Sequence, residues 1–565
     1  MRRSQLAAIT ASGIALAVSS GVSFGFNVTS NFAGGSGEYS TTATGIQNNL
    51  TPPDVNGAVG YSGTTEYVTE MINGYYGVYS PTGVASTQEN MNTFWASAAG
   101  YSALGSLVGD PTGAQFGLAG SSGAYDSKSK LSIEFTDPRI LYDPSSSRWF
   151  SSTLAVVEAT NTTSHQQYIL SSSFLVGASR TSNPNGAWSG FVVPSQPTPV
   201  ATVKPVSGSS YSVNAWADFD TLGVNGGNLY LNGNLYFAPN PSTGGYYAGF
   251  PQNTFIGSSN ILAIPKGSLL AAMPSVGGYQ VLHNIPSFTN QAAQNFSGST
   301  TTGYFYGTPN SNFNQLVQTT LVGTSAGNYQ MQQGIGSTVS LNVGNGNTAV
   351  PAAGQPGLPG SISVGDFRLS SNLTTAEGLI WGTQTVANPT NPTLDAVRWF
   401  AINPSNNTVL AQGILTNSSN SLYYGSIAVS TTGAIVIDFA ESGSAQYIST
   451  YIATGTFNGT NVTIGTPTLL HAGTGIYLQQ GLASGAAARW GDYSTVQVDP
   501  NNPSEFWIFQ ELPNGTNQNQ WDTQITAIDP PGGIGGTVPE PGVLPILFLG
   551  AAPLLLTLRR RKFGN

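Results

Sequence analysis

The chain has 565 residues, no cysteine and a formal net charge of −9, and only 7% of its residues are charged, against roughly 25% in an average protein. Without cysteine it can form neither disulfides nor thiolate metal sites, and with 16 Lys and Arg residues it cannot follow a phosphate backbone, which excludes nucleic-acid binding. The three histidines, His165, His283 and His471, are too far apart for a His-based zinc site.

The N-terminus has the pattern of a secretory signal peptide. Arg2 and Arg3 precede an apolar run over residues 6–18, and small residues follow up to Ser23. We expect residues 1–25 to be removed on export. The alternative, a membrane anchor, is disfavoured because the run is short for a span of about 20 residues. The Gly/Ser/Thr/Asn-rich stretch from Phe26 to Thr51 is either an extended lead-in or a strand that closes a ring.

A β-rich unit then recurs along the chain. Its clearest copy, TDPRILYDPSSSRWFSSTLAVVE, runs from Thr136 to Glu158. An alternating strand, an Asp-Pro-Ser turn and an aromatic second strand are typical of a β-hairpin. Further copies begin at Pro53, Ala217, Gly365, Tyr424 and Gly491.

The spacing of the copies predicts the fold. The residues that we take as equivalent anchors are Asp54, Asp137, Asp218, Asp366, Gly425 and Asp492. They are 83, 81, 148, 59 and 67 residues apart, so a degenerate copy is expected in the doubled gap before Asp366. Repeats of four short strands at such a period are typical of a β-propeller. We therefore predict an all-β propeller over residues 26–530, with seven blades and six as the alternative.

Three arginines stand close to the anchors. Arg139 and Arg368 each follow an anchoring Asp by two residues, and Arg489 precedes one by three. Converging guanidinium groups could bind a carboxylate, with the aspartates as acid/base groups. The alternative is structural, because Asp-x-Arg can lock neighbouring blades by salt bridges and Arg beside Trp is often packing. The candidate ligand-binding residues are Arg139, Arg368, Arg489 and Trp490, and the candidate catalytic residues are Asp137, Asp366 and Asp492.

No cofactor is expected, although calcium is possible. Asp54, Asn56 and Glu66 carry the oxygen ligands that calcium prefers, but they lack the spacing of an EF-hand loop, so turn capping is the alternative. The sequence contains no Gly-x-Ser-x-Gly elbow, P-loop or dinucleotide fingerprint.

The C-terminus carries three consecutive features after a Gly-rich linker at residues 531–537. Pro539, Glu540 and Pro541 come first, an apolar run over residues 543–558 predicts a transmembrane helix, and a basic cluster follows that should stay cytoplasmic. The basic cluster begins with Arg559, Arg560 and Arg561.

Residues 538–565 resemble the PEP-CTERM sorting signal of Gram-negative and related bacteria. The resemblance implies that an exosortase-type membrane protease recognises Pro539, Glu540 and Pro541, and that the tail is lost after transient anchoring in the membrane. It also implies delivery to the cell surface or the extracellular matrix.

The body is similar to a group of bacterial secreted β-propeller-like proteins that share the motifs TPPDxNGAVG, DPRxLYD and RWGDYS. They stand here at Thr51–Gly60, Asp137–Asp143 and Arg489–Ser494. This resemblance supports the fold and brings no reaction with it.

We expect a binding or structural protein whose ligand is carbohydrate, exopolysaccharide among the candidates. Sugars need hydrogen-bonding groups and aromatic faces more than charge, which suits a chain rich in Asn, Ser, Thr and Tyr. The alternative is a sialidase-like or other glycoside hydrolase with channel-facing Arg and Asp residues. A hydrolase requires water-accessible carboxylates about 5 to 10 Å apart, whereas a binding protein of this kind requires exposed Trp or Tyr.

Overall fold

The computed structural model describes most of the body of the chain. The described residues are 25–36, 52–108, 129–161, 167–195, 202–203, 211–212, 215–237, 255–309, 312–324, 328–330, 337–344, 346–479 and 485–530. They belong to one unit of the chain, residues 1–533. The predicted signal peptide, linker, sorting signal and membrane span lie outside them. No helix within these ranges is long and apolar enough to cross a membrane.

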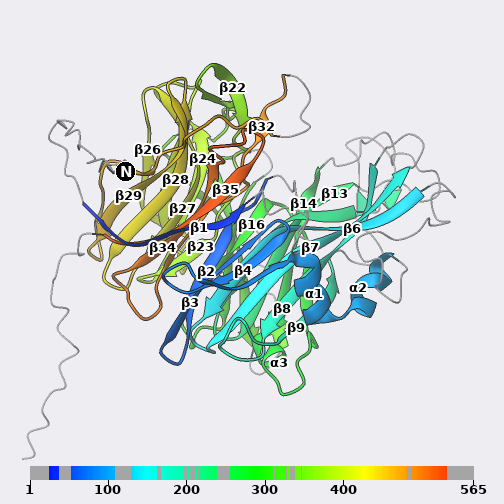
Figure 1. The fold of residues 1–565 in the computed structure, drawn as a ribbon. Helices are drawn as coiled ribbons and strands as arrows, with labels where there is room; N and C mark the ends of the chain where they lie inside the picture. Colours follow the sequence, from blue (N-terminus) through cyan, green and yellow to red (C-terminus); the bar gives the residue numbers. More distant parts are fainter. Residues whose placement is uncertain are drawn as a thin grey trace, which may run out of the picture. The chain divides into compact units, whose positions relative to one another are not determined.

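The structure is all-β, and its strands follow one another as antiparallel sheets (Figure 1). The first sheet contains β2 (Asn56–Ser62), β3 (Thr65–Ile72), β4 (Tyr75–Tyr79) and β5 (Ala85–Asn90). The second contains β6 (Ser129–Asp143), β7 (Arg148–Asn161), β8 (Gln167–Ser179) and β9 (Trp188–Pro194). The third contains β12 (Ala215–Val224), β13 (Asn228–Phe237), β14 (Phe255–Pro265) and β15 (Gln280–Ile285).

The next two sheets are joined by a short parallel contact between their first strands. One contains β16 (Phe288–Gln294), β17 (Thr302–Thr308) and β18 (Gln315–Thr324), with β19 (Asn328–Gln330) and β20 (Ser337–Ser340) both paired to β18. The other contains β23 (Leu373–Ala376), β24 (Leu379–Ala387), β25 (Asp395–Asn403) and β26 (Thr408–Leu415). The sheet that begins at β16 is the degenerate copy predicted between Asp218 and Asp366.

The remaining sheets complete the body. One contains β27 (Asn420–Val429), β28 (Ala434–Gly443) and β29 (Gln446–Phe457), with β30 (Val462–Ile464) and β31 (Thr468–His471) both paired to β29. The last contains β33 (Thr495–Val498), β34 (Phe506–Pro513), β35 (Trp521–Asp529) and the N-terminal β1 (Asn27–Ser36). Two small sheets stand apart, one of β10 (Thr202–Val203) and β11 (Tyr211–Ser212), the other of β21 (Ala353–Gln355), β22 (Leu358–Ser363) and β32 (Ala488–Arg489).

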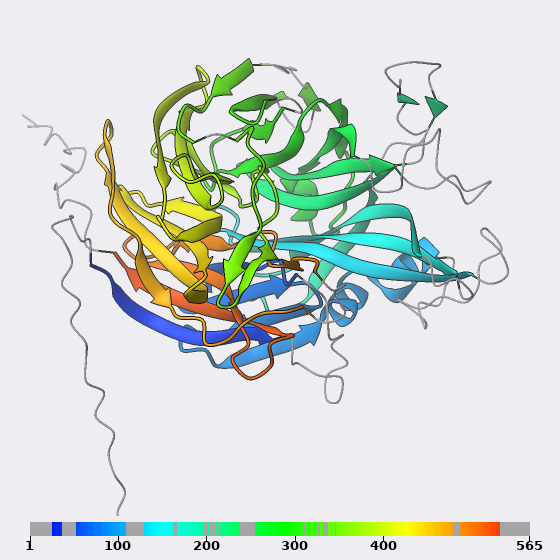
Figure 2. The same cartoon turned by 90° about the horizontal axis from the view of Figure 1, so that it is seen from above.

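The first strands of the large sheets form a closed ring. Contacts pass from β2 to β6, β12, β16, β23, β27 and β33, and β33 contacts β2 again. Figure 2 shows the sheets arranged around a central axis. Each sheet buries its faces against its neighbours, which is the architecture of a β-propeller. The prediction of an all-β, propeller-type fold is therefore confirmed.

The N-terminal strand closes the ring. β1 pairs antiparallel with β35, from Asn27 opposite Asp529 to Ser36 opposite Asp522. The dark blue strand consequently lies beside the red one in Figure 1. Of the two expectations for residues 26–51, the closing strand is confirmed for the described part.

Four of the inner strands bulge at one left-handed residue. φ lies between +50° and +63° at Asp137, Phe219, Thr289 and Tyr424, and the strand register shifts at the same points. Asp54, just before β2, has a φ of +53°. Such bulges bend a strand and redirect its side chains. The predicted anchors Asp218 and Gly425 are thus displaced by one position, since Phe219 and Tyr424 are the equivalents of Asp137.

The side chain two residues after each of these positions ties its sheet to the next. The pairs are Asn56 Oδ1 with Ile140 N (2.7 Å), Arg139 Nε with Asp220 O (2.9 Å), Thr221 Oγ1 with Asn290 O (3.1 Å), Gln291 Nε2 with Leu369 O (2.7 Å) and Ser426 Oγ with Val496 N (3.1 Å). Arg139 links two neighbouring blades, which is the structural alternative given above for the Asp-x-Arg pattern. It uses a backbone carbonyl and no salt bridge.

Helices are few among the described residues. α1 (Met91–Ala99) and α2 (Tyr101–Val108) follow β5, and α3 (Lys266–Leu269) follows β14. Asn90 caps α1, because its Oδ1 accepts a hydrogen bond of 2.7 Å from the amide of Thr93. Phe94 and Trp95 are buried on α1 and pack with Trp149 and Leu175 of the second sheet.

Gly57 of β2 provides a test of inter-sheet packing. A Cβ atom there would lie 2.2 Å from ring atoms of Phe509 on β34. We expect Gly57→Ala to lower the free energy of unfolding by about 2 kcal/mol, since a packed core must deform to admit the methyl group. Urea unfolding measures the change. Gly267→Ala is the matched control, because a Cβ at Gly267 meets nothing within 4 Å. Equal stability of the two variants would contradict the packing described here.

Candidate functional site

Charged side chains gather at the N-terminal ends of the inner strands. The described residues contain three ion pairs, Lys266–Asp143, Arg368–Asp366 and Arg489–Asp492, at 2.8, 2.9 and 3.0 Å. The last two lie at this end of the ring. There the positive charges of Arg368 and Arg489 both favour the ionised form of the Asp218 carboxylate. In a chain with 7% charged residues, this concentration marks a candidate site.

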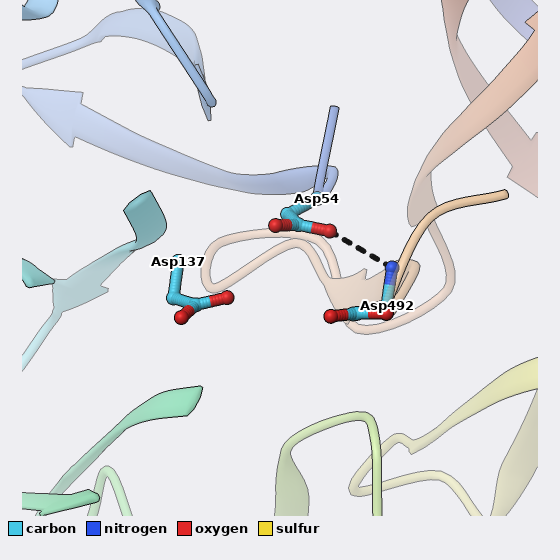
Figure 3. A group of neighbouring side chains, drawn as sticks. All are labelled: Asp54, Asp137 and Asp492. Carbon is cyan, nitrogen blue, oxygen red and sulfur yellow. Dashed lines mark hydrogen bonds between the residues drawn. The ribbon is translucent and has the colours of Figure 1, made fainter. Parts of the chain in front are cut away.

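Three aspartates meet at the centre of this region (Figure 3). One carboxylate oxygen from each of Asp54, Asp137 and Asp492 lies within 4.8 Å of the other two. They come from the loop before β2, from the bulge of β6 and from the loop between β32 and β33. We call Asp54, Asp137 and Asp492 the aspartate cluster.

Backbone and amide groups hold the cluster in place. Asp54 accepts hydrogen bonds from Asn73 Nδ2 at 2.6 Å and from the backbone amide of Asp492 at 2.9 Å. Asp137 accepts one from the amide of Phe219 at 3.0 Å. The amide of Asp137 in turn donates to Asn73 Oδ1 at 3.1 Å. Asn73 therefore positions both buried aspartates.

Two of the three aspartates are buried, and burial raises their pKa values. Asp54 and Asp137 are 1% and 3% exposed, whereas the Asp492 side chain is 16% exposed. Burial, reinforced by the charge of Asp492, raises the pKa of Asp54 to about 7. Burial and the neighbouring Asp218 raise the pKa of Asp137 well above its ordinary value. The cluster thus carries protons at neutral pH unless another positive charge replaces them.

A fourth carboxylate, which sequence reasoning missed, belongs to Glu511 of β34. It is 4% exposed, and its oxygens form no well-aligned hydrogen bond among the described residues, the backbone amide of Gly491 being the nearby donor. A Cβ at Gly491, next to Asp492, would lie 2.9 Å from Glu511 Oε2. Burial and the charge of Asp54 raise the pKa of Glu511 well above its ordinary value. Glu511 therefore lies against the cluster from the side of the last sheet.

Two guanidinium groups lie on the accessible side. Arg368 donates to both carboxylate oxygens of Asp366, each at 2.9 Å, and its Cζ lies 4.4 Å from the ring centroid of Phe219 and 5.2 Å from that of Phe288. Arg489, which is 54% exposed, donates to Asp492 Oδ2 at 3.0 Å. The Arg368 guanidinium thus covers two buried aromatic rings, whereas Arg489 reaches solvent.

Two of the predicted ligand-binding residues are closed to solvent, which corrects that prediction. Arg139 is fully buried, with its Cζ 3.3 Å from the ring centroid of Tyr493. Trp490 is buried against Tyr477 at a ring distance of 5.1 Å. Arg368 lies in the loop before β23 and not on an inner strand, so its position is not equivalent to that of Arg139. Arg368 and Arg489 remain candidates.

The acidic residues predicted as catalytic or calcium-binding do not form the groups that were expected. Of the catalytic candidates, Asp137 and Asp492 come together, whereas Asp366 is held by Arg368. The calcium candidates Asp54, Asn56 and Glu66 do not form one site. Asn56 is used between sheets, since its Nδ2 donates to Thr495 Oγ1 at 3.0 Å. Glu66 belongs to a separate acidic group, which it forms with Asp499 and Glu505.

Exposed tryptophan platforms are not present. All nine tryptophans lie in described ranges, eight are buried and Trp188 is half-buried.

The opposite ends of the inner strands surround a mainly apolar cavity of about 590 Å³. Residues that line it include Val59, Tyr142, Phe296, Ala428 and Val496.

Comparison with models of known families gave no match, and comparison with curated proteins gave none. Similar solved structures include a protein of unknown function from Dyadobacter fermentans, at 7% identity and a TM-score of 0.35, with 70% of this chain and 95% of that one covered. Another is the N10 neuraminidase-like protein of A/little yellow-shouldered bat/Guatemala/060/2010, at 9% identity, a TM-score of 0.31 and coverages of 74% and 94%. A third is an exo-β-1,3-galactanase from Clostridium thermocellum, at 10% identity, a TM-score of 0.24 and coverages of 83% and 95%. Similarity this weak carries no argument, so the fold rests on the strand topology.

Proposed function

We propose that the protein is an exported propeller that binds carbohydrate at the N-terminal ends of its inner strands. The observation that carries the proposal is the presence of two partly exposed ion pairs at one end of the ring, the first of them packed on buried aromatic rings. Asp366–Arg368 stands over Phe219 and Phe288, and Arg489–Asp492 stands beside it. Carboxylates accept and guanidinium groups donate paired hydrogen bonds, which suits neighbouring hydroxyl groups.

The proposal includes the organisation of the whole chain. We take the ring of inner strands as seven blades, the last completed by β1. Residues 1–25 would direct export, and residues 538–565 would be recognised by an exosortase-type protease. The product would act at the cell surface or in the extracellular matrix, with exopolysaccharide as a partner. The sequence resemblances described above support this part of the proposal.

A glycoside hydrolase is the second candidate function. It is favoured by the contrast between Asp54, whose pKa of about 7 suits a general acid, and the more exposed Asp492 within 4.8 Å of it. It is opposed by the burial of Asp54 and Asp137, because a substrate must reach both carboxylates. Binding without turnover is therefore the better supported function.

A glycan array and a set of chromogenic glycosides test the two functions on the full chain. We expect binding without hydrolysis, and we expect Arg489→Ala to weaken it at least about tenfold, because one charge-assisted contact contributes roughly 1.5–3 kcal/mol. Arg180→Ala is the matched control, since Arg180 is exposed on a rim turn and donates to Ala272 O at 3.0 Å.

Two outcomes would contradict the proposal. Hydrolysis that Asp492→Asn abolishes would favour the enzyme. Glycan binding that Arg489→Ala and Arg368→Ala both leave intact would place the ligand elsewhere. Circular dichroism of each variant establishes that it is folded.

A further inference from the structure

The three oxygens of the aspartate cluster meet within 4.8 Å, Glu511 lies beside them, and a single ion pair reaches this group in the described residues. Arg489 pairs with Asp492, and it is the one guanidinium in the described residues that forms an ion pair with a member of this group. Arg368 is engaged by Asp366. Arg139, although buried nearby, makes no ion pair with Asp137 and donates its Nε to a backbone carbonyl.

Glu511 provides an observation independent of the cluster. A carboxylate that is 4% exposed and has only the backbone amide of Gly491 as a nearby donor, without a well-formed hydrogen bond, is costly to bury, whether it is protonated or charged. Its principal charged neighbours are Asp54 and Asp492. Three aspartate oxygens within 4.8 Å of one another also repel when ionised. A cation bound among them would supply partners for the unsatisfied oxygens and remove the repulsion.

We propose that Asp54, Asp137 and Asp492 bind a divalent cation, with Glu511 completing the acidic shell from the side of β34. The ligand set is all oxygen, which hard cations prefer and zinc does not. Calcium fits best. Its bonds to oxygen, at about 2.3–2.6 Å, allow oxygens on opposite sides of the ion to lie nearly 5 Å apart, whereas the shorter bonds of magnesium require a tighter cage.

The cation enters from the accessible side of the ring. Asp492 is the one member of the cluster with a solvent-accessible side chain, so it is the entry ligand, and Asp54 and Asp137 form the floor. The Asp54 carboxylate accepts a hydrogen bond of 2.9 Å from the backbone amide of Asp492. This bond fixes the loop that carries Asp492, the third ligand. The site differs in position from the second acidic group, Glu66, Asp499 and Glu505.

The inference does not rest on carbohydrate binding. The two sites share Asp492, which pairs with Arg489, so Glu511→Gln, which changes only the cation site, separates the two properties. Glycan binding is therefore measured in the presence of a chelator and again with calcium. Calcium binding is measured without glycan.

The test is calorimetric titration of the metal-free full chain with calcium chloride, together with thermal unfolding. We expect one ion per chain and a melting temperature raised by about 3 °C when calcium is about a hundredfold above its Kd. Binding near pH 6 should release protons, because the raised carboxyl pKa values leave protons for the cation to displace. Magnesium should bind more weakly.

Variants locate the ion. Asp492→Asn and Glu511→Gln keep the shape of each side chain, and we expect Asp492→Asn to weaken calcium binding at least about tenfold. Glu505→Gln, in the second acidic group, should leave the affinity unchanged. The proposal is overturned if the folded wild-type chain binds no calcium at about 10 mM. It is equally overturned if Asp492→Asn and Glu511→Gln both bind like wild type, or if Glu505→Gln alone abolishes binding.

Discussion

The free energy of unfolding should decrease as the pH rises from about 5 to about 8, in contrast to the acid lability common among proteins. The reason is a set of buried carboxyl groups whose pKa is raised by desolvation. Burial raises the pKa of Glu70 to about 7 and those of Asp220, Asp395 and Asp438 to about 8. These groups enter the folded core as neutral acids.

The sign follows from the number of bound protons. Above about pH 4 the unfolded chain has released the protons of these groups, while the folded chain keeps them until the pH reaches 7 to 8. The folded state therefore binds more protons across this window, and its stability falls with rising pH. One pKa unit corresponds to about 1.4 kcal/mol, so the combined loss over the four groups is on the order of 10 kcal/mol.

Urea unfolding at about pH 5, 6, 7 and 8 in the presence of a chelator measures this loss. Asp438→Asn should flatten the profile by raising stability at pH 8 and leaving it nearly unchanged at pH 5, because the amide cannot ionise and can still accept from Gln510 Nε2. Glu377→Gln, at an exposed turn, is the matched control. Stability that is constant or rises across this range would show that the buried carboxylates are ionised and otherwise compensated.

Removal of residues 25–36 should produce the second large effect. β1 supplies a full strand to β35, Phe32 packs against the rings of Tyr79 and Trp507, and the amide of Gly35 donates to Glu70 Oε2 at 2.7 Å. Without β1 the last sheet loses its outer partner and Glu70 loses one of its two donors. We expect a loss on the order of 5 kcal/mol in the free energy of unfolding and exposure of an aggregation-prone sheet edge.

Limited proteolysis and urea unfolding of the truncated chain measure this effect. A synthetic peptide of residues 25–36 added to the truncated chain should restore part of the stability, because a free sheet edge accepts a strand from outside. A scrambled peptide of the same composition is the control. A truncated chain that unfolds at the same urea concentration as the intact one would mean that β1 contributes nothing to ring closure.

The propeller could be predicted from the sequence because its signals are local. The alternation and turn residues of Thr136–Glu158 are sufficient to define a hairpin, and the doubled spacing before Asp366 pointed to the sheet that begins at β16. In two sheets the predicted anchor is one residue away from the observed one, because nothing in the sequence indicates the left-handed backbone at Phe219 and Tyr424. Bulky residues adopt it there only because the bulge and the neighbouring sheets impose it.

The site could be predicted only in part, for a related reason. Asp54, Asp137 and Asp492 were noticed as recurring anchors, but their convergence depends on how three inner strands meet at the axis. Glu511 lies within a strand whose sequence predicts nothing special, and only the register of β34 brings it to Asp54. The burial of Arg139 beneath Tyr493 likewise depends on a contact between distant segments.

The closing strand also fixes when the fold can be completed. Ser36 bonds to Asp522, 486 residues further along the chain. A ribosome or an export channel delivers the N-terminus first, so β1 must wait for β35 through nearly the whole of synthesis or translocation. The earlier sheets can form in order as they emerge, but the last sheet is assembled from both extremities of the described body. Ring closure is thus a late step in folding. A chain that ends before Trp521 lacks β35 and therefore has no partner for its first strand.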